Sequence, residues 1–119
     1  MDEAKIATVV RRFYGRVRQD PLLAPIFENA IADWDHHLGL LSAFWSSVML
    51  TSGRYKGNPM AAHLKHAPHL TPEAFDRWLS LWETTTAELL PSDEAEAMLS
   101  RARRIAASLR LGLQYHAAA

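Results

Sequence analysis

Most of the information in this chain lies in the stretch Tyr55-Lys56-Gly57-Asn58-Pro59-Met60-Ala61-Ala62-His63. Asn58 is a favourable N-cap, and Pro59 suits the first helical position, where its missing N–H would have no partner inside the helix anyway. The residues that follow, up to Leu64, have room for little more than one helical turn. The stretch therefore predicts a loop and then a short turn started by proline, with His63 held rigidly on it.

Long amphipathic segments flank this stretch on both sides. Their apolar residues recur at steps of three and four, which is the spacing of a helix with one buried face. The expected helices span residues 2–17, 33–50, 71–89 and 92–115. No segment alternates apolar and polar residues as a half-buried strand would. The sequence therefore predicts an all-α fold with four substantial helices and one very short one.

Two connections and one buried face complete this prediction. Asp20-Pro21 ends the first helix, and residues 22–27 predict a compact apolar turn closed by Pro25. The connection between the second and third long helices covers about twenty residues and, apart from the short turn with His63, should be irregular through Pro68. Such a long connection is unusual in a compact domain unless it has a purpose. A bound cofactor would supply that purpose. The face that the third long helix should bury consists of Phe75, Trp78, Leu79, Trp82 and Leu89.

Length and composition indicate one ordinary domain and exclude several classes of protein. The chain has 119 residues, 49% of them hydrophobic, which is enough for a single domain with its own core. Thirteen basic residues balance thirteen acidic ones, so charge favours neither nucleic acid nor an anionic membrane as a partner. No signal peptide or membrane-spanning stretch is visible. The absence of cysteine excludes thiolate chemistry and fits a reducing compartment, so we expect a cytoplasmic protein.

His63 is the first candidate for chemistry. A rigidly held histidine in an apolar helical protein is what a haem iron needs on its proximal side. The ordinary alternative is a surface histidine, or one whose hydrogen bonds are satisfied within the fold. His66 and His69 follow at steps of three and raise a zinc site as a rival. Pro68 interrupts the helix before His69, however, and no carboxylate follows at ligand spacing.

Three other side chains could take part in a site. His37 precedes Leu41 on the apolar side of its helix, so it is either a histidine at the edge of the core or one above a ligand pocket. Its neighbour His36 points elsewhere. Tyr14 and Trp78 are donors on separate helices, and each could be explained by a hydrogen bond within the core. If both faced one cavity, they would suit a partly anionic ligand.

Taken together, these residues resemble the third group of truncated haemoglobins over nearly the whole chain. The most specific matches are the stretch Tyr55–His63 and Phe75 with Trp78-Leu79. The other matching pieces are Phe13-Tyr14 with Val17-Arg18, Asp20 through Ile26-Phe27, Trp34 followed by His37, and Phe44-Trp45. This group lacks the Gly-Gly loop motifs of the other two groups, and the chain has no Gly-Gly.

The resemblance implies a single truncated globin domain over residues 1–119. Two helix pairs would sandwich haem b (iron protoporphyrin IX), with a proximal helix of about one turn. The implied proximal iron ligand is His63. The implied distal residues are the hydrogen-bond donors Tyr14 and Trp78 and the histidine that can gate the pocket, His37. The implied haem contacts are the apolar wall residues Phe13, Leu41 and Trp45, with Tyr55 near the haem edge.

The implied function is reversible binding, and so storage or transport, of O2 and other diatomic ligands such as NO and CO at a pentacoordinate iron. A haem redox enzyme acting on nitric oxide, nitrite or peroxide, with a reductase as electron donor, is the alternative. A remote alternative is a cofactor-free helical interaction module whose aromatic residues serve only as core. Candidates for pairing with the haem propionates, by proximity to His63, are Arg54, Lys56 and Lys65.

Overall fold

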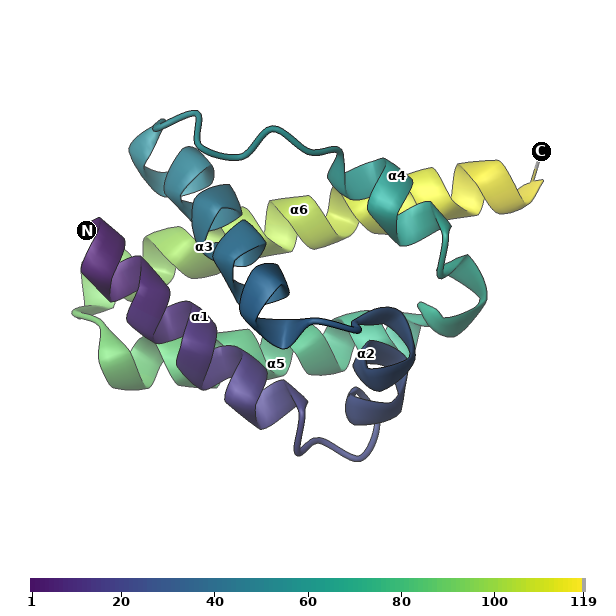
Figure 1. The fold of residues 1–119 in the computed structure, drawn as a ribbon, viewed down its shortest axis with the longest axis horizontal. Coiled ribbons are helices and arrows are strands. Elements are labelled where there is room, and N and C mark those ends of the chain that lie inside the picture. The colour runs from purple at the N-terminus through teal and green to yellow at the C-terminus, as the bar shows by residue number, and fades with distance from the viewer. Residues whose placement is uncertain (119) are drawn as a thin grey trace.

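The computed structural model describes residues 1–118, which form helices joined by loops (Figure 1). The helices are α1 (Glu3–Val17), α2 (Ala24–Ala30), α3 (Trp34–Leu50), α4 (Pro59–Leu64), the 3-10 turn η1 (Ala67–His69), α5 (Pro72–Leu89) and α6 (Ser92–Ala118). No β-strand occurs within residues 1–118, so the prediction of an all-α fold is confirmed. Ala119, the last residue of the predicted domain, lies outside the described residues.

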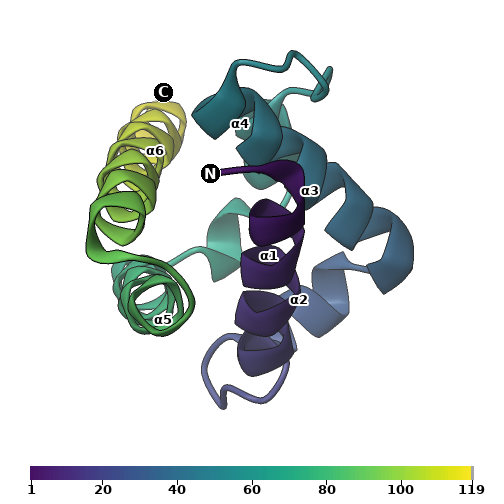
Figure 2. The same ribbon diagram turned by 90° about the vertical axis from the view of Figure 1, so that its left-hand side faces the viewer.

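The long helices form two layers, which Figure 2 shows on either side of the molecule. α5 and α6 run side by side as one pair, and α1 packs across α3 to form the other. α1 also packs against α5 and so joins the two layers. The short helix α4 lies against the C-terminal half of α6 (Figure 1). The expected arrangement of two helix pairs is therefore present.

Side-chain caps explain where four of the helices begin. In each case the cap accepts a hydrogen bond of 2.8–3.2 Å from the backbone N–H three residues further on. The capping residues are Asp2, Asp33, Asn58 and Thr71. Pro59 and Pro72 follow their caps directly, at the helical position that proline tolerates best. The predicted starts of these helices are confirmed.

The main departure from the sequence prediction is α2, a helix where only a compact apolar turn is expected. Pro25 lies in its first turn, where a proline removes no helical hydrogen bond. Its N-cap residue, Leu23, has no capping side chain. Instead the buried Asp20 carboxylate accepts the backbone N–H groups of Leu22 and Leu23 at 3.1 and 3.0 Å. The Asp20 carboxylate thus fixes the turn that leads into α2 without capping the helix itself, and local propensity rules do not reveal this.

Two smaller predictions are wrong. Leu89 is 37% exposed rather than buried, because the chain turns into an extended conformation at Leu90, which takes the buried place. Residues 67–69 form a 3-10 turn where the sequence predicts irregular structure. Neither change alters how the long helices are arranged.

A core of aromatic rings joins the two layers. The fully buried Trp82 stacks on Trp45 with ring centroids 4.5 Å apart and on Trp78 at 5.6 Å. Phe13 meets Trp82 edge-on at 4.8 Å. The indole N–H of Trp82 donates to the Met98 carbonyl at 3.3 Å, so this buried donor is satisfied. Within residues 1–118, no helix is long and apolar enough to cross a membrane.

Candidate functional site

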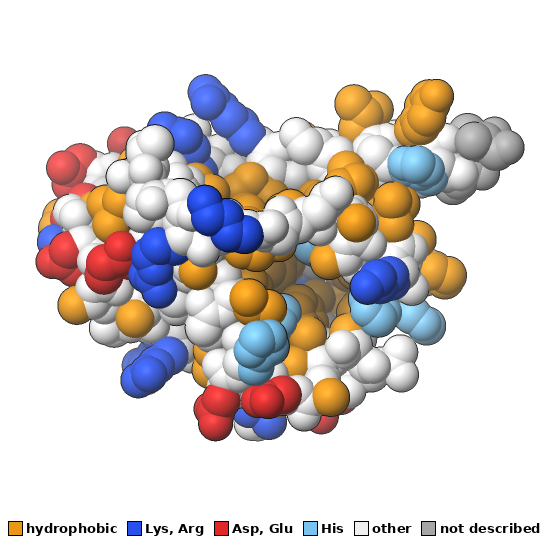
Figure 3. Space-filling model, turned by 45° about the horizontal axis from the view of Figure 1, so that its top comes forward, with side chains coloured by type: hydrophobic (Ala, Val, Ile, Leu, Met, Phe, Trp, Pro, Cys, Tyr) orange, Lys and Arg blue, Asp and Glu red, His pale blue; other side chains and the backbone are white. Residues whose placement is uncertain are grey.

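A largely apolar cavity of about 280 Å³ lies between the helix layers and is lined by residues from both. Figure 3 shows it as a hollow bordered by hydrophobic side chains, with histidines nearby. Its volume is close to the lower end of the range for small-molecule pockets. The predicted site residues that line it are Tyr14, His37, Leu41, Trp45, Tyr55, His63 and Trp78. The structure therefore gathers residues that are far apart in the sequence around one space.

His63 is oriented by its own short helix. Its Nδ1 lies 2.6 Å from the carbonyl oxygen of Pro59, one turn earlier in α4. A carbonyl oxygen can only accept, so Nδ1 donates this hydrogen bond and Nε2 is the ring nitrogen left for a metal. Histidines that bind metals usually donate their other N–H to a carbonyl or carboxylate in this way. Asn58 caps α4 and so fixes where this helix begins. The carbonyl of Pro59 in that first turn then orients the imidazole.

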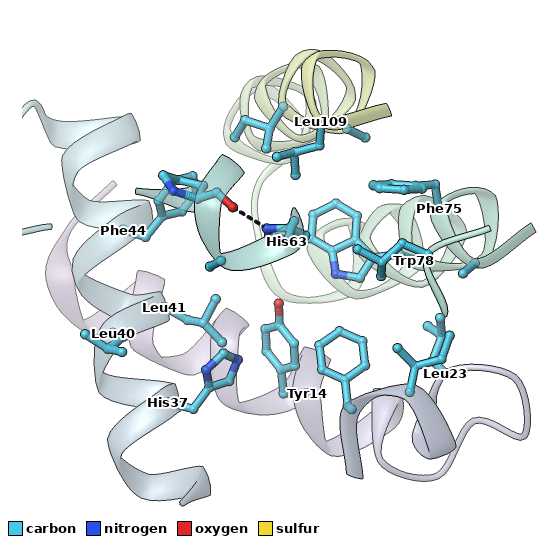
Figure 4. A pocket seen from close by; sticks show the side chains of 18 of the residues that line it. Tyr14, Leu23, His37, Leu40, Leu41, Phe44, His63, Phe75, Trp78 and Leu109 are labelled. Atoms are coloured by element: carbon cyan, nitrogen blue, oxygen red, sulfur yellow. Dashed lines mark hydrogen bonds between the residues drawn. The ribbon is translucent and has the colours of Figure 1, made fainter. Parts of the chain in front are cut away.

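Tyr14 and His63 approach the same space from different elements. Figure 4 shows the Tyr14 hydroxyl directed into the cavity from α1, with His63 and Trp78 facing that space from α4 and α5. The Tyr14 side chain is 4% exposed. Burial raises the pKa of Tyr14 to about 12, and the neighbouring indole of Trp78 partly offsets this rise. The phenol therefore stays protonated at neutral pH and available as a hydrogen-bond donor.

His37 is half-buried on α3 and lines the cavity beside the exposed Leu40. Its ring packs edge-on against Tyr14, at 6.0 Å between centroids, and against Trp34, at 5.6 Å. Burial lowers the pKa of His37, and the nearby histidines 36 and 63 lower it further. The imidazole is therefore neutral at pH 7. His36 is exposed, in keeping with its expected direction away from the apolar face.

Phe13 and Tyr55 occupy different kinds of position. Phe13 does not line the cavity; it is fully buried behind Tyr14 and belongs to the aromatic core instead. The Tyr55 ring lines the cavity and packs edge-on against Phe44 at 5.3 Å. The backbone N–H of Tyr55 donates to the Ser47 hydroxyl at 2.9 Å, which attaches the loop to α3.

Several lining residues are absent from the predicted site. Among them are Phe27, Leu40, Phe44, Phe75 and Leu109. Most were recognisable from helical periodicity as residues of apolar faces. Periodicity cannot tell an apolar residue that contacts another side chain from one that faces an internal cavity. To identify these residues as cavity lining, one needs to know the position of each helix relative to the others, which the sequence does not show.

The donor set around the cavity fits haem better than a zinc ion. His66 is half-buried and His69 is exposed on η1. Within residues 1–118, no three His, Cys, Asp or Glu side chains come together as a metal site would require. A haem iron needs only one histidine from the protein on its proximal side. The single free Nε2 of His63 meets that requirement.

The charge of the surrounding sequence also fits haem. From His36 to Pro72 the chain contains no Asp or Glu but includes Arg54, Lys56 and Lys65. These residues form α3, the long loop, α4 and η1, which contribute much of the cavity lining. Haem brings two propionate groups, and a region with only positive charges is suited to receive them.

Comparisons with known proteins agree with this site. The profile of the bacterial-like globin family matches residues 2–110. The group 3 truncated hemoglobin ctb of Campylobacter jejuni subsp. jejuni is 34% identical over 110 residues, covering 89% of this chain and 86% of that protein. The crystal structure of the group III truncated hemoglobin from Campylobacter jejuni matches with a TM-score of 0.85 at 33% identity, covering 95% of this chain and 91% of that one. The chain therefore belongs to the bacterial-like globins, as a group III truncated haemoglobin with the haem-binding function of that family.

Proposed function

We propose that this globin is a single domain that holds haem b through His63 and reversibly binds O2 and other diatomic ligands. The observation that carries the proposal is the hydrogen bond from His63 Nδ1 to Pro59, which leaves Nε2 free at the cavity. Bound haem would supply an iron with an open coordination position for a diatomic molecule. Because the chain has no cysteine, thioether attachment is impossible, which supports non-covalent haem b.

The distal side chains have separate tasks in this proposal. Tyr14 donates a hydrogen bond from its protonated phenol, and Trp78 offers a second donor, its indole N–H. Both suit a diatomic ligand that carries partial negative charge. The neutral His37 stands at the cavity edge, where it can hinder or admit a ligand without bringing a charge. The apolar wall formed by residues such as Leu41 and Trp45 limits entry of water.

For the propionate groups, Lys56 and Lys65 are the better candidates of the three basic residues near His63. The Arg54 guanidinium already pairs with Glu3 at 2.5 Å. Both lysines are exposed on either side of α4. Replacing each by Gln should speed loss of haem without abolishing its binding.

The proposal is tested by loading the purified chain with haem. His63→Ala should lose or transform the Soret band of the histidine-ligated haem. His66→Ala and His69→Ala are matched controls, because they remove neighbouring histidines of the same segment, and both should keep the spectrum. A wild-type chain that stays colourless would overturn the proposal and favour the cofactor-free helical module.

A redox enzyme acting on nitric oxide, nitrite or peroxide is the second candidate. It is favoured by the presence of two donors, Tyr14 and Trp78, in one pocket, since strong donors make ligand release slow and assist cleavage of O–O bonds. Such an enzyme would need a reductase as electron donor. We place it in the cytoplasm because a chain without cysteine fits a reducing compartment. Rapid consumption of nitric oxide by the O2-loaded protein, together with very slow O2 release, would favour this second function.

A further inference from the structure

Trp34, the first residue of α3, stands directly behind the distal side of the cavity without lining it. Its indole contacts three rings that do line the cavity. The centroid distances are 5.6 Å to His37, 6.1 Å to Tyr14 and 6.3 Å to Phe27. These rings come from α1, α2 and α3, so the Trp34 indole is in contact with side chains of all three helices.

The geometry of these contacts confines the His37 imidazole. Its ring stands nearly perpendicular to Trp34, at 85°, and nearly perpendicular to Tyr14, at 84°. Edge-to-face contacts of this kind are favourable and directional. Tyr14 and Trp34 also lie 6.1 Å apart, so the three rings form a compact triangle, and the orientation of His37 depends on where the other two rings are held.

Arg18 holds the outer side of Trp34. Its guanidinium carbon lies 4.6 Å from the centre of the Trp34 ring, within the range of a cation–π contact. Arg18 also lies 3.9 Å from the carboxylate of Glu28 on α2. Arg18, the C-cap residue of α1, therefore lies against both the indole at the start of α3 and a carboxylate of α2.

Core packing alone does not account for a tryptophan here. Within residues 1–118, Trp34 Nε1 is the one buried side-chain nitrogen or oxygen without a hydrogen-bond partner. An unpartnered buried donor costs stability. Phenylalanine at this position would fill most of the same space without that cost, but its smaller ring would reach Arg18 and His37 less well.

We infer that Trp34 is a positioning residue for His37, and that Arg18 fixes Trp34 through its guanidinium. This inference rests on the proposed function, because it assigns the control of His37 at the edge of the haem pocket. A loosened Trp34 would let the imidazole move away from Tyr14, so ligand access would change while the iron ligand and distal donors remained.

The inference is tested with Trp34→Phe, Arg18→Gln and the control Arg12→Gln, an exposed arginine on the same helix. Each full chain is loaded with zinc protoporphyrin, which is diamagnetic, and the nuclear Overhauser contacts between the His37 and Tyr14 rings are measured. The same proteins are loaded with haem to measure CO association rates. Thermal unfolding of each variant reports whether the fold is kept.

Trp34→Phe and Arg18→Gln should weaken the contacts between His37 and Tyr14 and change the CO association rate by about two- to fivefold, the size expected from one cation–π contact. Arg12→Gln should change neither. Trp34→Phe should unfold at the same or a higher temperature, which a merely structural tryptophan would not do. Wild-type contacts and rates in both variants would overturn the inference.

The experiment still decides the inference if a variant fails to fold or if wild type binds no porphyrin. If Trp34→Phe fails to fold, Arg18→Gln keeps the indole and decides alone. If wild type takes up neither porphyrin, the proposed function fails instead. The contacts between His37 and Tyr14 measured in the unloaded chains then show whether Trp34 positions His37.

Discussion

Tyr14 is held by aromatic neighbours on several sides, so its hydroxyl has little freedom to turn away from the cavity (Figure 4). Tyr14→Phe keeps these ring contacts and removes only the donor. A hydrogen bond to a charged acceptor contributes about 1.5–3 kcal/mol, so O2 dissociation should become roughly ten- to a hundredfold faster. Stopped-flow measurement of O2 release from the haem-loaded chain checks this.

The comparison for Tyr14 is Phe44→Leu, which changes the cavity wall without removing a donor. Its O2 dissociation rate should stay within a few-fold of wild type, since it alters only packing. If Tyr14→Phe and Phe44→Leu behave alike, the phenol does not reach the ligand and the distal part of the proposal is wrong.

Gly57 is required by the position of Tyr55. A Cβ added at Gly57 would collide with the hydroxyl and ring of Tyr55, which folds back over it. Gly57→Ala should therefore displace the phenol and destabilise the fold by about 1 kcal/mol, the lower end of the range for overpacking, because the colliding atoms are the far end of a half-buried side chain. Urea unfolding of wild type, Gly57→Ala, Tyr55→Ala and the double variant measures the coupling. If Gly57→Ala lowers the free energy of unfolding equally in the wild type and in Tyr55→Ala, the collision with Tyr55 is not the reason for glycine at this position.

At the scale of helices, local signals predicted the structure wherever the cap lies next to the helix it starts. Asn58 and Thr71 are examples, because each is followed directly by proline and caps the amide three residues later. α2 could not be recognised in this way. The turn that leads into it is fixed by Asp20, whose carboxylate is also bound by Arg77 from α5, 57 positions away in the sequence. A long-range ion pair leaves no periodic pattern in a sequence.

The buried Asp20 carboxylate predicts how the free energy of unfolding changes at acid pH. Burial by itself would raise the pKa of Asp20, but hydrogen bonds from Arg77 and from the amides of Leu23 and Leu22 hold it below the ordinary value of 3.8. A carboxyl with a lowered pKa stabilises the fold above pH 3.8, and this contribution is lost as pH falls through the folded-state value. Asp20→Asn should therefore cost about 1.5–3 kcal/mol at pH 7.

The difference between Asp20→Asn and wild type should shrink below pH 4, because the asparagine does not titrate while the native aspartate becomes protonated. Urea unfolding at pH 7, 5 and 3.5 follows this difference directly. Arg12→Gln serves as the control for a change of one charge on an exposed surface. If the difference in unfolding free energy stays constant with pH, the charge on Asp20 does not stabilise the turn that leads into α2.

At the scale of the molecule, the sequence predicted the helices and most of the candidate site but could not separate core from cavity. Phe13 and Tyr14 are neighbours on α1 and both are buried. One is enclosed by Trp78 and Trp82, whereas the other faces the cavity. The difference arises only when α5 and α3 meet α1, so it is a property of the assembled layers. The same holds for Phe75, which periodicity places on a buried face without showing that it faces the cavity.

Burial is distributed unevenly between the long helix α1 and the short elements around His63, and this predicts where haem acts on stability. α1 buries six residues, including Ile6, Val10 and Phe13, whereas α4 and η1 bury none completely. Segments with few buried contacts open at low free energy. In the haem-free chain, the backbone amides of residues 60–69 should therefore exchange with deuterium much faster than those of α1. Hydrogen exchange followed by mass spectrometry resolves these segments.

Adding haem should protect residues 60–69 most, because His63 would tie α4 to a group that also contacts α1, α3 and α5. A ligand that binds only the closed form at 100 times its Kd stabilises it by about 2.7 kcal/mol, so exchange there should slow by roughly a hundredfold. In His63→Ala this protection should be lost, while exchange in the core of α1 stays as in the haem-free wild type. Equal protection in wild type and His63→Ala would contradict the claim that His63 orders α4 by binding haem. α4 would then be ordered by haem contacts that do not involve its histidine.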